Sequence, residues 1–369
     1  MIKVLLAIRS LDIGGAEKQF IELVKHIDKF KFEVTVCTMY GGIQEPLIKN
    51  VSNITYVNFQ KQGRYDFYSF YKNYSKLIEE VNPSVIYSFL GEMSLFSLWA
   101  KPKKTKIIWG FRTSDKDWSQ YGKVSRGIFW LQKKFSSKVD KIISNSFASI
   151  EYHKEHGFDM QKAVVIANGI DTNRFQRDNE KRKLLRNEYG LNKDDIVIGM
   201  VARLDKIKGY LIFSEVAKRI VTEYENVYFV SVGGGSQEIQ SKCEYILGEY
   251  NEKRFFWLGQ QQNVEDIYSG FDIAVSASFG EGFSNSIAEA MSSSLACVVT
   301  DVGDSALIVD EYGVVVEAKE VDSLYDGLVE MLAKDYKFLG EESRKGVVEN
   351  FSIEKMVKNT EKEIIKCVE

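Results

Sequence analysis

The sequence is poor in several residues and patterns that mark particular classes of protein. It contains three prolines and no low-complexity run, so we expect no long disordered linker. Its four cysteines form no Cys-x-x-Cys pair, which is typical of a reducing compartment and predicts no zinc site. No segment approaches the roughly 20 apolar residues of a membrane-spanning helix. The net charge of −3 argues against a general nucleic-acid-binding protein, so we expect no nucleic acid as a partner.

What the chain does contain indicates a globular protein. Apolar residues make up 44% and aromatic residues 13%, which is enough for sizeable cores, and 369 residues suggest two domains. The chain begins with a strand-like segment, residues 2–8, instead of the charged and apolar regions of a signal peptide. Together with the cysteine pattern, this predicts a cytoplasmic protein.

Apolar segments of strand length alternate with helical patterns along the chain, which predicts an α/β fold with parallel sheets covered by helices. The strands expected in the first half are residues 3–8, 32–38, 54–59, 84–89, 106–111, 141–146 and 163–167. Those expected in the second half include residues 196–202, 227–232, 271–277, 296–300 and 313–316, before helices at 321–332 and 353–368. Residues 176–187 are charged without a core pattern, so we predict an interdomain linker near residues 170–190.

The most informative segment is residues 281–291, Glu-Gly-Phe-Ser-Asn-Ser-Ile-Ala-Glu-Ala-Met. It follows the expected strand 271–277 and becomes helical, with Ser284 or Asn285 as the N-cap. The backbone N–H groups at residues 283–285 then point out of the helix N-terminus. Free donors and the helix dipole favour a diphosphate there.

Two carboxylates and two cations complete this predicted site. Glu281 lies in the loop and Glu289 in the second helical turn. Because a carboxylate repels phosphate, we expect both to accept hydrogen bonds from sugar hydroxyls. Arg203 and Lys208 follow the expected strand 196–202, and a fixed pair of cations there suits a diphosphate leaving group. They would stabilise the charge that develops as the sugar–phosphate bond breaks.

Adjacent glycines, Gly14 and Gly15, connect the first expected strand to a helix and let the backbone approach a ligand closely. They do not form the Gly-x-Gly-x-x-Gly fingerprint of dinucleotide-binding proteins. The second strand also ends at residues 37–40 without the acidic residue that binds a ribose in those proteins. A nicotinamide-dependent enzyme is therefore not expected.

Together these features resemble a known family. Glu281 and Glu289, separated by seven residues and followed by Gly-Phe and Ala-Met, resemble the signature of the retaining nucleotide-sugar glycosyltransferases of family 4. Residues 14–17, 168–175 and 203–209 are similar to further motifs of that family, in the same order and over nearly the whole chain. The resemblance implies the GT-B fold, with two Rossmann-like domains facing a cleft and a C-terminal helix that crosses back to the first domain.

The resemblance also implies how the chain divides. Residues 1–170, with a C-terminal helix at about 353–369, would form the acceptor-binding domain, and residues 190–352 the nucleotide-sugar-binding domain. No metal or other cofactor is expected, because cations and helix termini neutralise the phosphates and the chain has no Asp-x-Asp motif.

Individual roles follow from the same motifs. Arg203 and Lys208, on the diphosphate, and Glu281, on the sugar, are the expected catalytic residues. Glu289 is expected to bind the ribose. The expected donor site comprises Gly15, Arg203, Lys208, Glu281, Gly282, Phe283, Ser284, Asn285 and Glu289. The expected acceptor side comprises Gly14, Gly15 and Arg112.

Arg112 departs from the family pattern, because many members carry a histidine in the loop after the strand 106–111. Two interpretations stay open. Arg112 binds an anionic acceptor or a sugar hydroxyl, or it forms a structural ion pair with Asp115 or Asp117. The three histidines, His26, His153 and His156, lie in helical, polar contexts and are expected on the surface.

Residues 101–141 are strongly basic, with twelve Lys or Arg against three Asp, a net charge of +9. From Tyr121 onwards they mix large apolar and cationic side chains. Such a helix can lie on an anionic membrane surface. It can also be a domain helix whose apolar side meets the sheet while its lysines are solvated, which the glycines at 122 and 127 favour.

We therefore predict a retaining, metal-independent glycosyltransferase that moves a sugar from a nucleoside diphosphate sugar, with UDP favoured. The acceptor would be a hydroxyl of a glycan or lipid-linked glycan in cell-surface polysaccharide or lipopolysaccharide biosynthesis. The alternatives are a sugar-nucleotide epimerase of the same fold and a non-catalytic sugar-nucleotide-binding protein. An epimerase needs acid–base residues that the sequence does not obviously offer, and a catalytically dead relative often lacks one of the four charged site residues.

Overall fold

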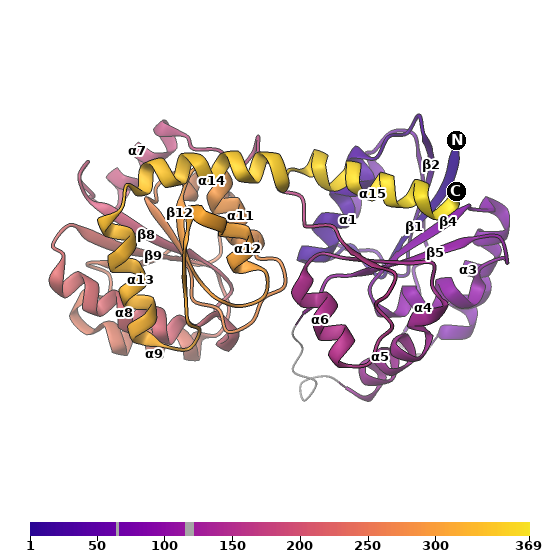
Figure 1. Ribbon diagram of the computed structural model, residues 1–369, viewed down its shortest axis with the longest axis horizontal. Helices are drawn as coiled ribbons and strands as arrows, with labels where there is room; N and C mark the ends of the chain where they lie inside the picture. Colours follow the sequence, from indigo (N-terminus) through magenta and orange to yellow (C-terminus); the bar gives the residue numbers. More distant parts are fainter. Residues whose placement is uncertain (64–65, 115–121) are drawn as a thin grey trace. The chain divides into compact units, whose positions relative to one another are not determined.

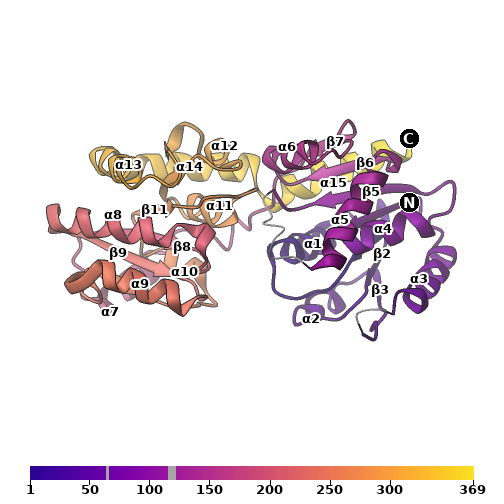
Figure 2. The same cartoon turned by 90° about the horizontal axis from the view of Figure 1, so that it is seen from below.

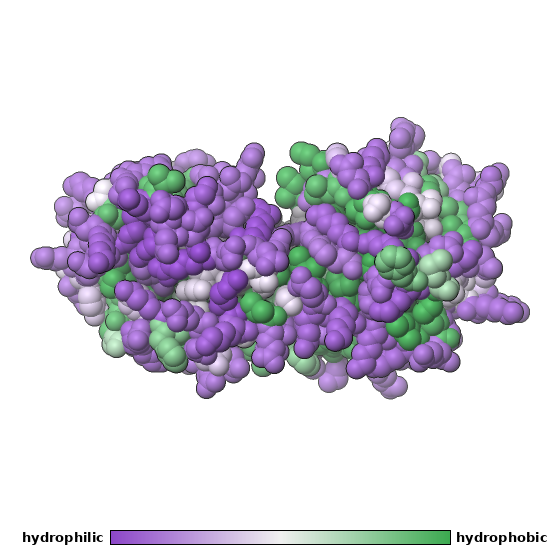
Figure 3. Space-filling model, turned by 90° about the horizontal axis from the view of Figure 1, so that it is seen from above, coloured by the Kyte–Doolittle hydropathy of each residue, from purple (hydrophilic) through white to green (hydrophobic). Residues whose placement is uncertain are grey.

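The computed structural model describes residues 1–63, 66–114 and 122–369. These residues divide into two compact units, one of Met1–Gly169 with Ile353–Glu369 and the other of Ile170–Ser352. Each unit is a parallel sheet flanked by helices, as the alternating pattern predicted (Figures 1 and 2). On the face drawn in Figure 3, hydrophobic residues are more frequent on the first unit than on the second.

The first unit has a seven-stranded parallel sheet with the order β3-β2-β1-β4-β5-β6-β7. Its strands are β1 (Ile2–Ile8), β2 (Phe32–Thr38), β3 (Ile54–Asn58), β4 (Val85–Phe89), β5 (Lys106–Phe111), β6 (Lys141–Ser144) and β7 (Ala163–Val165). In the central register Val4 pairs with Val34 on one side and Val85 on the other. Central strands of such a sheet are buried on both faces, which explains their nearly continuous apolar sequences.

Helices cover both faces of this sheet. They are α1 (Gly15–His26), α2 (Glu45–Lys49), α3 (Phe67–Val81), α4 (Gly91–Ala100), α5 (Lys123–Phe135), α6 (Phe147–Glu155) and α15 (Ile353–Val368). Helix α15, from the end of the chain, contributes Met356, Val357 and Ile364 to the core that α1 shares with the sheet. The predicted return of the C-terminal helix to the first domain is therefore confirmed.

The second unit has a six-stranded parallel sheet with the order β10-β9-β8-β11-β12-β13. Its strands are β8 (Ile196–Val201), β9 (Val227–Val232), β10 (Phe255–Trp257), β11 (Ile273–Ser276), β12 (Ala296–Thr300) and β13 (Val314–Val316). Its helices include α7 (Asn179–Glu188), α8 (Tyr210–Glu223), α9 (Gln237–Leu247), α10 (Val264–Tyr268), α11 (Asn285–Ser292), α12 (Ser305–Val309), α13 (Val321–Ala333) and α14 (Tyr336–Asn350). Both sheets reverse their strand order beside the first strand, and ligands of such sheets bind beyond the carboxyl ends of the strands at that reversal.

The structure differs from the linker predicted near residues 170–190, because this segment belongs to the second unit and contains α7. Charged side chains anchor the helix. Arg182 and Arg186 donate hydrogen bonds to the two carboxylate oxygens of Asp272, at 2.6 and 3.2 Å, and Asp272 is 4% exposed. Since α7 is held by ion pairs as well as by packing, its sequence shows little core pattern. The second unit accordingly begins at Ile170 and not at residue 190.

Candidate functional site

The predicted residues of the second half gather at the carboxyl edge of the six-stranded sheet. The loops that follow β8 and β11 lie against each other there, and the N–H of Phe279 donates to the carbonyl of Ile207 at 2.7 Å. Gly209 has a φ of +68°, and any side chain on it would overlap the carbonyl oxygen of Ala277. The glycine thus permits the close approach that brings Lys208 beside the loop of Glu281.

Lys208 and Glu281 form an ion pair, with 2.5 Å between Nζ and Oε1. Their side chains are 23% and 13% exposed, so the pair is partly shielded from water. Ser278 Oγ donates a second hydrogen bond to the same carboxylate oxygen at 2.7 Å. The structure therefore brings two of the three predicted catalytic residues into direct contact.

Hydrogen bonds from the neighbouring strand β12 and from the loop that follows it hold the loop that carries Glu281. Thr300, its last residue, is buried and donates through Oγ1 to the carbonyl of Ser278 at 2.6 Å. The N–H of Asp304 donates to the carbonyl of Gly282 at 3.0 Å. These bonds hold the backbone on both sides of Glu281 and so set the position of its carboxylate.

Arg203 lies after β8 but outside the Lys208–Glu281 pair. Its side chain is 72% exposed and donates to Asp205 Oδ2 at 2.9 Å. The other oxygen of Asp205 accepts from the N–H of Ile207 at 3.2 Å, which fixes the short turn before Lys208. An exposed pair of this kind contributes little to stability, so Arg203 can exchange its partner at low cost.

Helix α11 begins at Asn285 with Ser284 as its N-cap, one of the two residues predicted for that position. The side chain of Ser284 makes no capping hydrogen bond, and the first N–H groups of a helix have no acceptor within the helix. Phe283 and Ser284 are 7% and 2% exposed, and the ring of Phe283 packs on Phe351 at 5.3 Å. The start of the helix is thus rigidly placed, and its donors and dipole suit an anion.

Glu289 lies in the second turn of α11 and is half-buried. Beneath it the hydroxyl of Tyr268 donates to the carbonyl of Ser286 at 2.8 Å. Complete burial raises the pKa of Tyr268 well above its usual value, and the charge of Glu289 raises it further. Tyr268 therefore stays a neutral donor that supports the helix.

The glycine loop of the first unit forms the start of α1, with Gly14 as the N-cap and Gly15 as the first helical residue. Gly14 is extended, with a φ of −168°. A side chain at this position would displace the carboxylate of Glu17, which lies over the helix start. Burial raises the pKa of Glu17 above its ordinary value, and the neighbouring charge of Asp12 acts in the same direction.

Arg112 follows β5, and its guanidinium turns toward residues of the first unit. It donates to Asn168 Oδ1 at 3.0 Å and to the hydroxyl of Tyr87 at 3.1 Å, and it lies 5.0 Å above the ring of Phe89. Asp115 and Asp117, its predicted ion-pair partners, lie outside the described residues. Among the residues that the structure describes, the hydrogen-bond partners of this guanidinium are therefore neutral groups.

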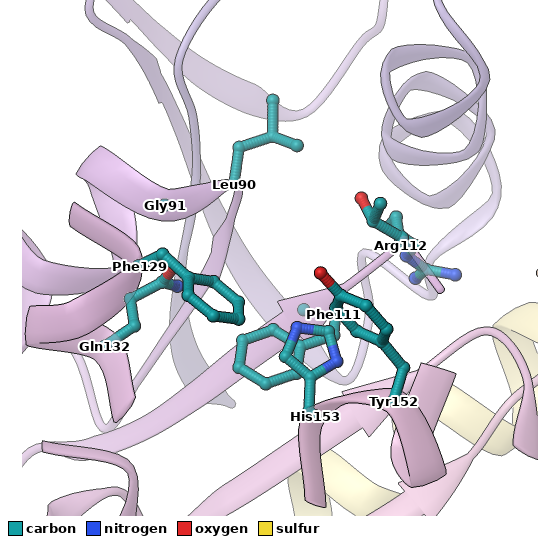
Figure 4. Close-up of a pocket in the computed structure, with 10 residues that line it drawn as sticks. Leu90, Gly91, Phe111, Arg112, Phe129, Gln132, Tyr152 and His153 are labelled. Atoms are coloured by element: carbon teal, nitrogen blue, oxygen red, sulfur yellow. The ribbon is translucent and has the colours of Figure 1, made fainter. Parts of the chain in front are cut away.

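His153 differs from its expected place on the surface. It is 6% exposed, stacks on Phe111 with 4.2 Å between ring centroids, and shares a hydrogen bond of 2.7 Å between Nδ1 and the carbonyl of Ser149. With Tyr152 it lines a small pocket at the end of β5 (Figure 4). The polar sequence around it gave no sign of this burial, which depends on aromatic residues distant along the chain.

The basic segment contains α5, which packs on α4 and exposes part of its apolar side. Gln132 is its one buried residue among those described, whereas Trp130 is 56% exposed with Lys134 Nζ 5.3 Å above its ring. An apolar groove of about 380 Å³ runs beside the helix, lined by Phe67, Glu92, Leu95, Phe96, Trp99, Val124, Gly127, Ile128 and Leu131. Tyr121, the start of the predicted amphipathic stretch, lies outside the described residues.

No helix in the described ranges is both long enough and apolar enough to cross a bilayer. Within the same ranges, no group of three or more His, Cys, Asp or Glu side chains is arranged to hold a metal ion.

Two models of known protein families match the chain, one in each half. Residues 13–174 match the sequence model described as Glycosyltransferase Family 4, and residues 195–334 match that of Glycosyl transferases group 1.

Two relatives are informative. The UDP-Gal:alpha-D-GlcNAc-diphosphoundecaprenol alpha-1,3-galactosyltransferase of Escherichia coli is 32% identical over 209 residues, which cover 55% of this chain and 54% of that protein. The alignment thus spans about half of the relative's length. The N-acetylgalactosamine-N,N'-diacetylbacillosaminyl-diphospho-undecaprenol 4-alpha-N-acetylgalactosaminyltransferase of Campylobacter jejuni is 25% identical over 360 residues, 91% of each chain.

Among solved structures, Anabaena Alr3699/HepE in complex with UDP superposes with a TM-score of 0.81 at 18% sequence identity, over 99% of this chain and 100% of that chain. At this identity the similarity establishes the shared fold, and it covers both units.

Proposed function

Because the chain is a glycosyltransferase of the GT-B fold, similar to family 4, we propose that it transfers a sugar from a UDP-sugar to a hydroxyl group of a lipid-linked glycan. The Lys208–Glu281 pair beside the N-terminus of α11 carries this proposal. It places a cation that can bind phosphate next to a carboxylate that can accept hydrogen bonds from sugar hydroxyls, at one edge of the sheet. The names of the two relatives support a diphosphoundecaprenol-linked acceptor, and one names UDP-Gal as donor. The family favours transfer over the epimerase and the non-catalytic binder.

In this proposal the second unit, Ile170–Ser352, binds the donor, and the first unit binds the acceptor. The donor's diphosphate takes over Lys208 from Glu281 and accepts hydrogen bonds from the N–H groups at residues 283–285. Arg203 joins it, because its exposed side chain is held by one surface pair alone among the described contacts. Glu281 then accepts from the sugar hydroxyls and Glu289 from the ribose.

Breaking the bond between the sugar and the diphosphate leaves negative charge on the phosphate. Lys208, Arg203 and the start of α11 stabilise this charge without a metal ion. The leaving phosphate oxygen accepts the proton of the attacking hydroxyl on the face from which it departs. The new bond forms on that same face, so the configuration at the anomeric carbon is retained and no protein base is required.

The acceptor side comprises Gly14, Gly15 and Arg112 in this proposal. A lipid-linked acceptor lies in a membrane. Helix α5 carries cationic side chains and borders an apolar groove, and both features suit contact with a membrane surface. We therefore propose peripheral contact of this helix with the anionic cytoplasmic face of the membrane, in cell-surface polysaccharide biosynthesis.

Thermal unfolding with UDP, GDP and ADP, each with and without EDTA, tests the donor site. A nucleotide at 100 times its dissociation constant adds about 2.7 kcal/mol to the free energy of unfolding. We expect this shift with UDP, unchanged by EDTA, and transfer to a synthetic diphospholipid-linked sugar with retained anomeric configuration by NMR. A shift with GDP or ADP alone would contradict uridine as the base of the donor. Loss of the UDP shift in EDTA would contradict metal-independent binding. A product with inverted anomeric configuration would contradict the retaining mechanism.

A further inference from the structure

The pocket beside His153 lies at the carboxyl edge of the first sheet, where β5 ends and α4 begins, with α5 and α6 at its sides (Figure 4). Its volume is about 50 Å³. A compact polar substituent of a sugar fits this space.

Hydrogen-bond donors at the start of α4 and the side-chain amide of Gln132 both line this pocket. Leu90, the N-cap of α4, provides no side-chain cap, so the first N–H groups of this ten-residue helix remain as donors. Gln132 on α5 is 8% exposed, and its amide makes no hydrogen bond to any residue that the structure describes. Its Oε1 lies 3.2 Å from the place that a Cβ on Gly91 would occupy. Because this amide lines the pocket and has no hydrogen-bond partner among the described residues, it is available to a ligand.

Aromatic side chains form much of the rest of the lining among the described residues, where Arg112 is the one residue with a permanently charged side chain. Phe111 is 5% exposed, Phe129 also lines the pocket, and the hydroxyl of Tyr152 points into the pocket (Figure 4). Arg112 borders the pocket. Its two Nη atoms donate to Asn168 and Tyr87 outside it, and its buried Nε has no hydrogen-bond partner among the described residues. Because aromatic rings form much of the remaining lining, the pocket suits a group that has an apolar part as well as a polar edge.

We propose that this pocket binds the acetamido group of an N-acetylated sugar in the acceptor. The carbonyl oxygen accepts from the first N–H groups of α4, the amide N–H donates to Oε1 of Gln132, and the methyl group packs between Phe111 and Phe129. The inference rests on the proposed transfer to a glycan and specifies the sugar that the acceptor presents to the first unit.

Saturation-transfer NMR on the full chain tests this without catalysis. The probes are the methyl glycosides of N-acetylglucosamine and of glucose, which differ in the acetamido group alone. We expect the acetamido methyl protons to receive the strongest saturation and the glucoside at least fivefold less. Gln132→Leu should lower the acetamido signal at least fivefold, whereas Lys133→Ala, the exposed neighbour on α5, should leave it unchanged. Phe129→Ala, at a half-exposed position, provides a second variant should Gln132→Leu unfold.

Equal saturation of both glycosides, saturation of neither, an unchanged signal in both pocket variants, or displacement of the acetamido signal by inorganic phosphate would each overturn the inference. Its failure is separable from that of the proposed function. Acetamido selectivity without UDP binding supports the pocket and refutes the transferase proposal. Equal transfer to acceptors that end in glucose and in N-acetylglucosamine supports the transferase and refutes the pocket.

Discussion

Lys208 lies 2.5 Å from Glu281, and the two charges satisfy each other at the site predicted to hold a diphosphate and a sugar. The pair holds both side chains in place before a ligand arrives. When a diphosphate replaces the carboxylate at Lys208, Glu281 keeps the hydrogen bond from Ser278 and becomes available to hydroxyl groups. The same contact thus prepares the cation for the leaving group and the carboxylate for the sugar.

Replacing Lys208 by Ala should lower kcat/KM by about 100-fold or more, because a charge that develops on the leaving phosphate loses its nearest cation. Steady-state release of UDP measures this. Lys206→Ala is the matched control, since Lys206 is an exposed lysine two residues earlier in the same turn. It should stay within about threefold of the wild type on the same scale. Equal losses in the two variants would show that the site responds to the charge of the loop and not to Lys208.

Thr300 acts on the site through Ser278, and its removal should lower kcat while leaving the KM for the donor nearly unchanged. Thr300→Val keeps the shape but removes the bond to the carbonyl of Ser278, a net loss of about 1 kcal/mol, or roughly fivefold in rate if it is expressed at Glu281. Thr300→Ser keeps the hydroxyl and should restore kcat. A rise in KM alone, or failure of Ser to restore the rate, would contradict this positioning role of Thr300.

The carboxylate of Asp272 should be among the most costly single groups to remove. Asp272→Ala leaves Arg186, which is 5% exposed, without its charge partner, and breaking a buried ion pair costs about 3–5 kcal/mol. Denaturant unfolding measures the loss. Asp322→Ala is the control, because Asp322 pairs with Arg219 at 2.6 Å but its side chain is 87% exposed, and such exposed pairs contribute little to stability. Similar losses in both would contradict an anchoring role for Asp272.

The strands and the last helix could be predicted from the sequence because their apolar pattern is dense. β2 (Phe32–Thr38) and α15 (Ile353–Val368) have the predicted ends. Helix α7 could not be predicted in this way, since Arg182 and Arg186 meet Asp272 only when a segment about 90 residues later folds against them. Long-range ion pairs leave little periodic trace in a sequence.

The sequence could predict that the candidate site residues gather at one sheet edge, but not how they pair. Arg203, Lys208 and Glu281 follow strands of one parallel sheet, whose carboxyl ends share an edge, so sequence order alone brought them together. That Lys208 pairs with Glu281 while Arg203 turns to Asp205 depends on how two loops pack, which no local pattern encodes. The burial of His153 escaped prediction because Phe111, its stacking partner, lies 42 residues earlier.

Glu17 should make the protein less stable as the pH rises. Burial raises its pKa in the folded protein above the ordinary value of 4.5, so the folded state binds the proton more tightly than the unfolded state. Its contribution is therefore most favourable below pH 4.5 and declines as the pH rises through the raised value. Glu17→Gln removes this dependence and should gain stability relative to the wild type from pH 4 to pH 7, measured by urea unfolding. A difference that is constant over this range would contradict the shift.

Membrane contact through α5 should depend on its exposed cations and on Trp130. Lysines near an anionic surface contribute about 1 kcal/mol each, so changing Lys133 and Lys134 to Gln should weaken sedimentation with phosphatidylglycerol vesicles about 30-fold. Trp130→Ala should weaken it further, because its ring is more than half exposed and offers apolar area to the interface. Changing Lys242 and Lys345, exposed lysines of the second unit that pair with glutamates, provides a control of equal charge. Binding should fall steeply with added salt. Equal weakening in the control, or no sedimentation of the wild type at low salt, would remove α5 as the membrane surface.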